Sequence, residues 1–162
     1  MESLWRIQTE TILPKENAAD MPSDECNYDV IVLGAGMAGI LIAFFLQEEG
    51  KNVLVLEADR IASGQTERTT AKITSQHALK YSKLIRQTGI DKARQYAQAN
   101  QLAIREYEQL IERLGINCQF ERLPAYLYTL KEKGLLEEEA RAASSLGIDS
   151  GQNYRCHPLS PP

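Results

Sequence analysis

The chain has 162 residues, of which 43% are apolar and 25% are charged, and its formal net charge at pH 7 is -4. This composition is that of a soluble globular protein, either one domain or part of a larger one. The negative charge gives no reason to expect a nucleic acid partner, because a duplex-binding surface needs clustered Lys and Arg. The longest apolar run, residues 39–46, is far shorter than the roughly 20 residues of a membrane span, so we expect none.

Residues 1–27 are expected to form an extended leader, because they mix polar residues with Pro14 and Pro22 and have no stable period. They also lack the apolar core of a secretory signal. The cysteines, Cys26, Cys118 and Cys156, are far apart and odd in number. That pattern favours free thiols in a reducing compartment, so we expect a cytoplasmic protein.

The stretch from Tyr28 to Glu57 has the order of a dinucleotide site. An apolar strand over residues 28–33 leads into Gly34-Ala35-Gly36-Met37-Ala38-Gly39, a helix over 37–47 and a second strand over 53–56. The first strand is apolar at consecutive positions, which is typical of a parallel sheet covered on both faces. We therefore predict an α/β fold, with a partial Rossmann-like βαβ unit.

The glycines have separate expected roles. Gly34 permits the tight turn, Gly36 lets the backbone approach a pyrophosphate, and Gly39 lets the helix pack closely on the strand. The amides and the positive dipole end of the helix then meet the phosphate charge. Ala43 and Gly50 complete the spacing GxGx2Gx3Ax6G, which favours a nucleotide site over a chance glycine-rich turn. The helix is apolar almost all round, so we expect more protein to cover its outer side.

Glu57 follows the second strand at its C-terminal end, where ligands gather in an open α/β sheet. A carboxylate there can accept hydrogen bonds from both adenosine ribose hydroxyls and would repel a 2′-phosphate, which disfavours NADP. A solvated acid at a strand end is the alternative. The next loop, Ala58 to Lys72, is rich in hydroxyls and small residues and could continue along the ligand, or it could be a solvated loop.

These features resemble a known family. The glycine pattern, Glu57 and the loop with Thr69-Thr70-Ala71-Lys72 look like the N-terminal part of FAD-dependent oxidoreductases of the D-amino-acid oxidase and glycine oxidase superfamily. The bacterial branch whose members carry a C-terminal Rieske iron-sulfur domain is the most similar. The resemblance covers about residues 28 to 148.

The resemblance implies FAD as the cofactor. Arg60 would lie near the adenosine end, and the inner part of the cofactor would run along Thr66, Thr69, Thr70, Ala71 and Lys72. Lys72 would sit beside the flavin ring, where a cation stabilises the reduced form, or remain an exposed lysine. His77 is better explained as a structural or surface residue than as a flavin-side group. The expected cofactor-binding residues are Gly34, Ala35, Gly36, Met37, Ala38, Gly39, Glu57, Ala58, Arg60, Thr66, Thr69, Thr70, Ala71 and Lys72.

Helices dominate the rest of the expected structure. The pattern predicts a short helix over 79–89, a long one over 91–114 ended by Gly115, and a third over 132–146 ended by Gly147. An apolar stripe on the long helix is expected to pack in the core, formed by Ala97, Ile104, Tyr107, Ile111 and Leu114. Two short strands, 117–121 and 125–130, would form a hairpin around Pro124 that begins the substrate domain in the resembled family.

The expected organisation has four parts. A leader (1–27) precedes the FAD-binding unit with its flavin-contacting loop (28–78), a helical region with the start of a substrate domain (79–148), and an irregular tail (149–162). The tail differs from what the family leads us to expect; a truncated or frame-shifted reading is favoured over a native tail. Cys156 and His157 are adjacent and single, whereas a Rieske ligand pair is spaced by one residue and repeated, so we expect no metal.

The resemblance implies a parent enzyme that oxidises amines or amino acids by hydride transfer to the flavin, followed by imine hydrolysis. Only two sheet strands are expected, so the first would keep an unpaired edge. In the resembled family, C-terminal segments close over the flavin and supply most of the substrate pocket. Because the chain is expected to lack these segments, we expect it to be inactive alone. We name no catalytic acid or base. The alternatives are a non-catalytic nucleotide-binding module that works with a partner chain, and an NAD-binding half-domain.

Overall fold

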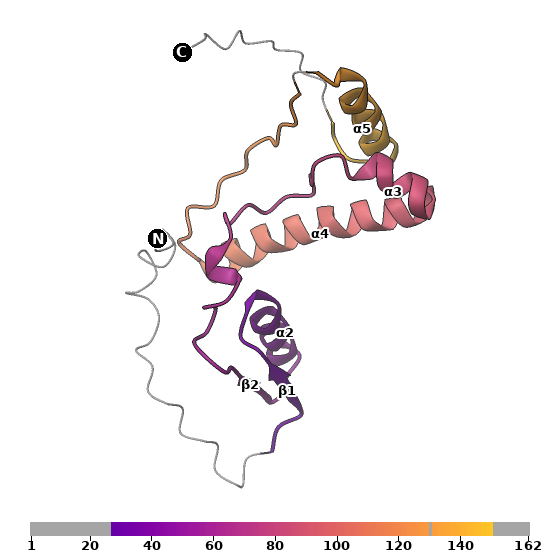
Figure 1. Cartoon of the computed structure of the whole chain (residues 1–162). Helices are drawn as coiled ribbons and strands as arrows, with labels where there is room; N and C mark the ends of the chain where they lie inside the picture. Colours follow the sequence, from indigo (N-terminus) through magenta and orange to yellow (C-terminus); the bar gives the residue numbers. More distant parts are fainter. Residues whose placement is uncertain (1–26, 130, 151–162) are drawn as a thin grey trace. The chain divides into compact units, whose positions relative to one another are not determined.

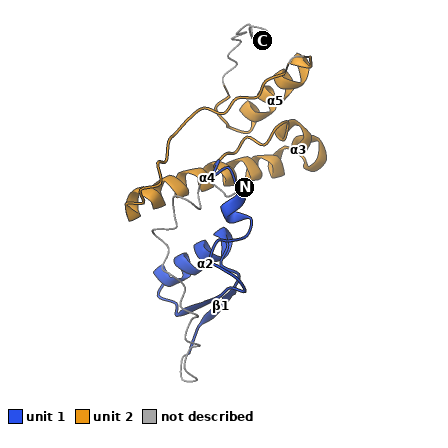
Figure 2. Cartoon of the chain, turned by 60° about the vertical axis from the view of Figure 1, so that its left-hand side comes forward, with its two compact units in different colours: residues 1–72 blue, residues 73–162 orange. Residues whose placement is uncertain are grey.

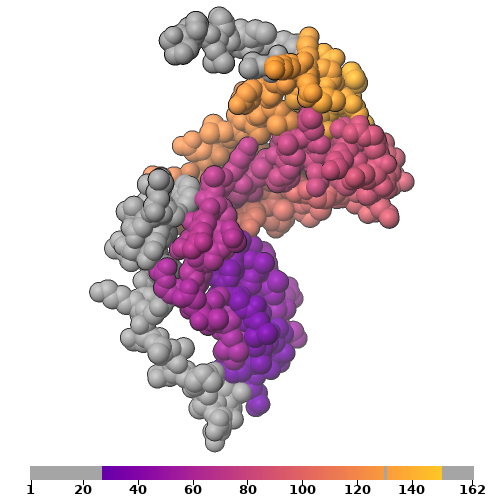
Figure 3. All heavy atoms as spheres, viewed as in Figure 1, coloured from indigo at the N-terminus to yellow at the C-terminus, as the bar shows by residue number. Residues whose placement is uncertain are grey.

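The computed structural model describes residues 27–129 and 131–150 (Figure 1 and Figure 3). The chain divides into two compact units, residues 1–72 and 73–162 (Figure 2). The first unit holds β1 (Val30–Leu33), α2 (Met37–Glu48), β2 (Val53–Leu56) and the short 3-10 helix η1 (Thr66–Arg68). The second holds α3 (Tyr81–Thr88), α4 (Ile90–Leu114) and α5 (Lys133–Ser145).

The first unit is a single βαβ crossover. Strands β1 and β2 are parallel, with Val30 opposite Val53 and Leu33 opposite Leu56. Helix α2 ends where Gly50 adopts a φ of 76°, and the Gly50 amide donates to the Gln47 carbonyl at 2.9 Å. The predicted α/β class and the partial Rossmann-like unit are confirmed.

Apolar side chains of this unit remain exposed. On β1, Ile31 is 56% and Leu33 is 79% exposed, and on the outer side of α2, Ile42 is 53% and Phe45 is 44% exposed. Among the residues that the structure describes, β1 pairs only with β2. Because burial of apolar surface is the main driving force of folding, these surfaces are suited to contact with further protein.

The second unit has a small core where α3, α4 and α5 meet. Its buried residues are Tyr81, Ala93, Ala97, Ala143 and Leu146. The alanines allow close packing of the helices at these contacts. The predicted stripe on α4 holds at Ala97, which is fully buried, but Leu114 at the far end is 48% exposed. The helix ends as expected at Gly115, which adopts the left-handed conformation with a φ of 61°.

The predicted hairpin is wrong over residues 117–129, which form irregular chain. Its apolar side chains are not packed: Leu123 is 75%, Tyr126 is 69% and Tyr128 is 88% exposed. A two-stranded hairpin is marginal in water unless a further strand or a helix covers it, which explains why alternation alone did not suffice. Arg122 instead ties the segment to α4, through an ion pair of 2.6 Å with Glu108.

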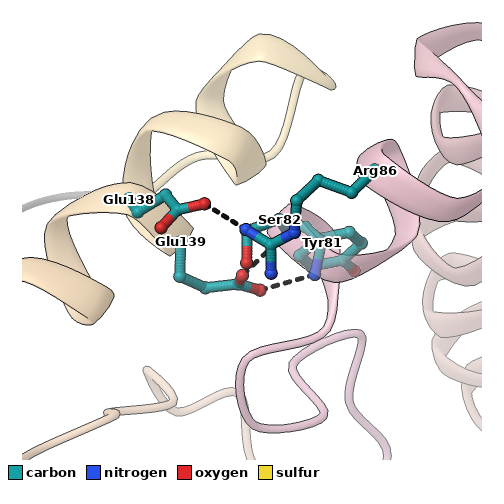
Figure 4. A network of polar contacts seen from close by, with 5 residues as sticks. All are labelled: Tyr81, Ser82, Arg86, Glu138 and Glu139. Carbon is teal, nitrogen blue, oxygen red and sulfur yellow. Dashed lines mark hydrogen bonds and ion pairs between the residues drawn. The ribbon is translucent and has the colours of Figure 1, made fainter.

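A buried carboxylate joins α5 to the start of α3 (Figure 4). Glu139 is 2% exposed, and its two oxygens accept hydrogen bonds from the amides of Tyr81 at 2.7 Å and Ser82 at 2.9 Å. Beside it, Arg86 and Glu138 form an exposed ion pair. The carboxylate thus satisfies two of the amides that a helix N-terminus leaves unpaired.

Tyr81 fixes the segment before α3. Its hydroxyl donates to the Ser75 carbonyl at 2.5 Å, and burial raises the pKa of the phenol. Tyr81→Phe leaves this nearly buried carbonyl without its partner, so we expect a loss of about 1 kcal/mol in the free energy of unfolding. Urea denaturation measures it, with Tyr126→Phe at an exposed position as the control. Equal midpoints for the two variants would contradict the expectation.

Candidate cofactor-binding site

The glycine turn links the end of β1 to the start of α2. Gly34 has a φ of 97°, and its amide donates to the Leu56 carbonyl of β2 at 2.7 Å. A Cβ added at Gly39 would lie 1.9 Å from the Gly34 carbonyl oxygen and 3.4 Å from Val32 Cγ1. The helix therefore lies so close to the turn and strand that only glycine fits at position 39.

Five amides converge on this turn, and they differ in their partners. The Ala35 amide donates to Glu57 Oε2 at 2.7 Å, and the Met37 amide donates to Thr66 Oγ1 at 3.0 Å. The amides of Gly36, Ala38 and Gly39 make no hydrogen bond within the described part of the chain. The first turn of α2 carries no acidic residue. Unpaired amides at the positive end of a helix are suited to bind an anion.

Glu57 lies directly beside the turn. Oε1 accepts from the Asp59 amide at 3.0 Å, while Oε2 accepts from Ala35. The Ala35 amide, and then the Asp59 amide, hold the pKa of the Glu57 carboxyl below its usual value. The group is therefore charged at neutral pH, and each oxygen keeps a further lone pair for a hydroxyl donor.

The loop after β2 folds back over the turn. The Ala62 amide donates to the Ala35 carbonyl at 2.9 Å. At Gly36 an added Cβ would meet Thr66 Oγ1 at 3.5 Å, an ordinary contact distance. Arg60 pairs with Glu67 at 3.7 Å within the same loop. Thr66 is thus the loop side chain that reaches the amides of the turn.

The structure brings together part of the expected set. The six residues of the turn, Glu57 and Thr66 share one location. Further along the chain, Thr69 accepts a hydrogen bond from the Ala71 amide at 3.1 Å. Ala71 takes a positive φ of 52°, which is uncommon for a residue with a Cβ. Outside the turn, six expected residues are exposed: Glu57, Ala58, Thr69, Thr70, Ala71 and Lys72.

Other chemistry is sparse in the described ranges. Cys118 is an exposed free thiol, and His77 is exposed. No cluster of three or more metal-ligating side chains occurs among residues 27–129 and 131–150. Cys26, Cys156 and His157 lie outside these ranges. None of the helices described has the length and apolar character needed to span a bilayer.

The family of the chain follows from comparison with known proteins. A family model described as FAD dependent oxidoreductase matches residues 29–155. The chain belongs to this family. FAD is therefore its expected cofactor, and the resemblance inferred from the glycine pattern and the Thr-rich loop is confirmed.

Three relatives illustrate the family. The putative Rieske 2Fe-2S iron-sulfur protein YhfW of Bacillus subtilis is 37% identical over 150 residues, which cover 91% of this chain and 28% of that protein. The probable oxidoreductase OrdL of Haemophilus influenzae is 31% identical over 127 residues, covering 76% and 29%. The gamma-glutamylputrescine oxidoreductase of Escherichia coli is 28% identical over 123 residues, covering 74% and 28%.

The chain therefore spans less than a third of the length of each of these relatives, at 28%, 29% and 28%. No solved structure matches it.

Proposed function

We propose that this chain is the FAD-binding portion of a flavin-dependent oxidoreductase that acts on amines or amino acids. The observation that supports it is the glycine turn with Glu57 beside it. Three amides without an internal partner, at Gly36, Ala38 and Gly39, start a helix whose first turn carries no acidic residue. Such a donor set fits the diphosphate of FAD.

The residues would divide the cofactor between them. The three amides would hold the diphosphate, and Glu57 would accept hydrogen bonds from the adenosine ribose. Arg60 would lie at the adenosine end, and the inner part of FAD would run along Thr66, Thr69, Thr70, Ala71 and Lys72. When bound, FAD supplies the hydride acceptor of the reaction. The Lys72 ammonium would stabilise negative charge near the ring.

The substrate class rests on family membership and on one relative. The name gamma-glutamylputrescine oxidoreductase specifies a substrate with an amino group. Apolar side chains of the first unit are exposed, as is expected where further protein packs. We propose further that the residues forming the substrate pocket belong to that further protein, in a longer form of this polypeptide or in a partner chain. The 162-residue chain alone would then bind FAD without turnover.

Gly36→Ala tests the proposed diphosphate site, that is, the amides of Gly36, Ala38 and Gly39. Its Cβ would meet Thr66 Oγ1 at an ordinary 3.5 Å, so the fold should persist. The methyl group would, however, stand between the amides and the diphosphate. We expect the affinity for FAD to fall about tenfold or more, measured by flavin fluorescence quenching on addition of the protein.

Gly64→Ala is the matched control, because a Cβ at Gly64 meets nothing within 4 Å. Equal FAD affinity in both variants would contradict the proposed diphosphate site. Binding of NAD in place of FAD by the unaltered chain would support the half-domain alternative. Bleaching of bound flavin by an amine would refute the proposal that the chain alone is inactive.

A further inference from the structure

We propose that Glu57 is also a positioning residue: its carboxylate holds the backbone at Ala35 in the shape that receives a diphosphate. This task is separate from the ribose contact assigned above. The inference rests on the proposed function for its ligand. The hydrogen bond on which it is built, however, lies entirely within the chain, between the Ala35 amide and Glu57 Oε2 at 2.7 Å.

The first two residues of the turn, Gly34 and Ala35, are held at three backbone atoms. The Gly34 amide donates to the Leu56 carbonyl at 2.7 Å, and the Ala35 carbonyl accepts from the Ala62 amide at 2.9 Å. The third atom is the Ala35 amide, whose partner is Glu57. Of the three, this is the hydrogen bond made to a side chain, so it is the one that a substitution can remove while the backbone sequence of the turn stays intact.

Ala35 needs this partner. The residue is 2% exposed, so water has little access to its amide. If an apolar side chain replaced Glu57, the amide would therefore be left without a hydrogen-bond partner. Without the carboxylate, the Ala35 amide loses the hydrogen bond that fixes its orientation, so the peptide between Gly34 and Ala35 is held less firmly.

The same geometry separates the structural amides from the binding amides. Glu57 engages Ala35, and Thr66 engages Met37 at 3.0 Å. The amides of Gly36, Ala38 and Gly39, which have no partner among the described residues, lie next to these two fixed points. A donor set that is already oriented binds its ligand with less loss of conformational entropy.

Nucleotides with and without ribose hydroxyls separate the two tasks of Glu57. The probes are adenosine diphosphate and 2′,3′-dideoxyadenosine diphosphate, and the variants are Glu57→Leu and Glu57→Gln. A carboxylate that acts only on the ribose has no effect on the dideoxy probe. We expect Glu57→Leu to weaken dideoxy binding about tenfold, because the turn loses its support.

Glu57→Gln keeps an oxygen that can accept the Ala35 amide, so it should retain dideoxy affinity within about threefold. Unchanged dideoxy affinity in the Leu variant would overturn the proposal. So would a Gln variant as weak as the Leu variant. If the unaltered chain binds neither nucleotide, the proposed function fails, and the following measurement decides the inference alone.

The Ala35 amide can be followed by NMR as the pH is lowered without any nucleotide. Its proton shift should follow a titration with a midpoint below the ordinary carboxyl value of 4.5, because the hydrogen bond holds the pKa of Glu57 down. The other charged groups on the covering loop, Ala58 to Lys72, are Asp59, the Arg60–Glu67 pair, Arg68 and Lys72. Glu57→Gln should abolish the transition and Asp59→Asn should keep it; the reverse pattern rejects the proposal.

Discussion

Gly39→Ala is expected to unfold the N-terminal unit or destabilise it by about 3 kcal/mol, and to abolish FAD binding. In a helix, alanine is favoured over glycine by about 1 kcal/mol, so helix propensity alone predicts a gain in stability. The added Cβ would, however, lie 1.9 Å from the Gly34 carbonyl oxygen, which belongs to the backbone and cannot rotate away. The free energy lost to this clash exceeds the free energy gained from helix propensity, so the glycine turn would have to open.

The measurement is urea denaturation, with the signal taken from resonances of the first unit. Gly64→Ala is the control for the glycine substitution itself, since it meets nothing within 4 Å. Gly36→Ala provides a second comparison, because it should weaken FAD binding while keeping the wild-type unfolding midpoint. A stable Gly39→Ala variant would mean that the helix does not pack on the turn as described.

Glu139→Ala is expected to lower the stability of the second unit by about 3 kcal/mol. The substitution leaves the amides of Tyr81 and Ser82 without the acceptor that they share, at a site where Glu139 is 2% exposed. It also removes a negative charge from the N-terminus of α3, where the helix dipole favours one. Urea denaturation monitored by resonances of α3 and α5 measures the loss.

The neighbouring residue offers a matched control. Glu138 pairs with Arg86, but both side chains are substantially exposed, at 44% and 62%. Glu138→Ala should therefore cost no more than about 1 kcal/mol, as is usual for surface ion pairs. Glu139→Gln, which keeps one acceptor oxygen, should fall between the two. If the alanine variants at 138 and 139 are equally stable, the buried carboxylate is not what holds α5 to α3.

Local patterns predicted the βαβ unit well because each of its features has a local cause. The apolar strands, the glycine spacing and Gly50 specified β1, α2 and β2, and the structure has them at Val30–Leu33, Met37–Glu48 and Val53–Leu56. Hydrogen bonds between distant residues were not predictable in this way. The bond from Ala35 to Glu57 joins residues 22 apart, and that from Tyr81 to Glu139 joins residues 58 apart.

Glu139 was missed for a definable reason. It is the last of three successive glutamates, Glu137, Glu138 and Glu139, on a helix that reads as largely polar. A run of three acids is typical of a solvated helix face, yet Glu139 is buried. A signal was available in its position: it lies four residues before Ala143, on the face that meets α3 and α4. The hairpin prediction was wrong for the opposite reason. Its alternating apolar side chains have no surface to pack on among the described residues.

The edge of β1 that has no strand partner among the described residues also bears on the synthesis of the chain. Because β1, α2 and β2 are contiguous, the crossover can form as soon as the roughly 30 residues that follow position 27 have emerged from the ribosome. At that moment the nascent unit presents Ile31, Leu33, Ile42 and Phe45 to solvent. A paired strand with a free apolar edge is a template for association with other chains. Slow translation after β2 would prolong that exposure, and a chaperone that binds apolar segments would shorten it.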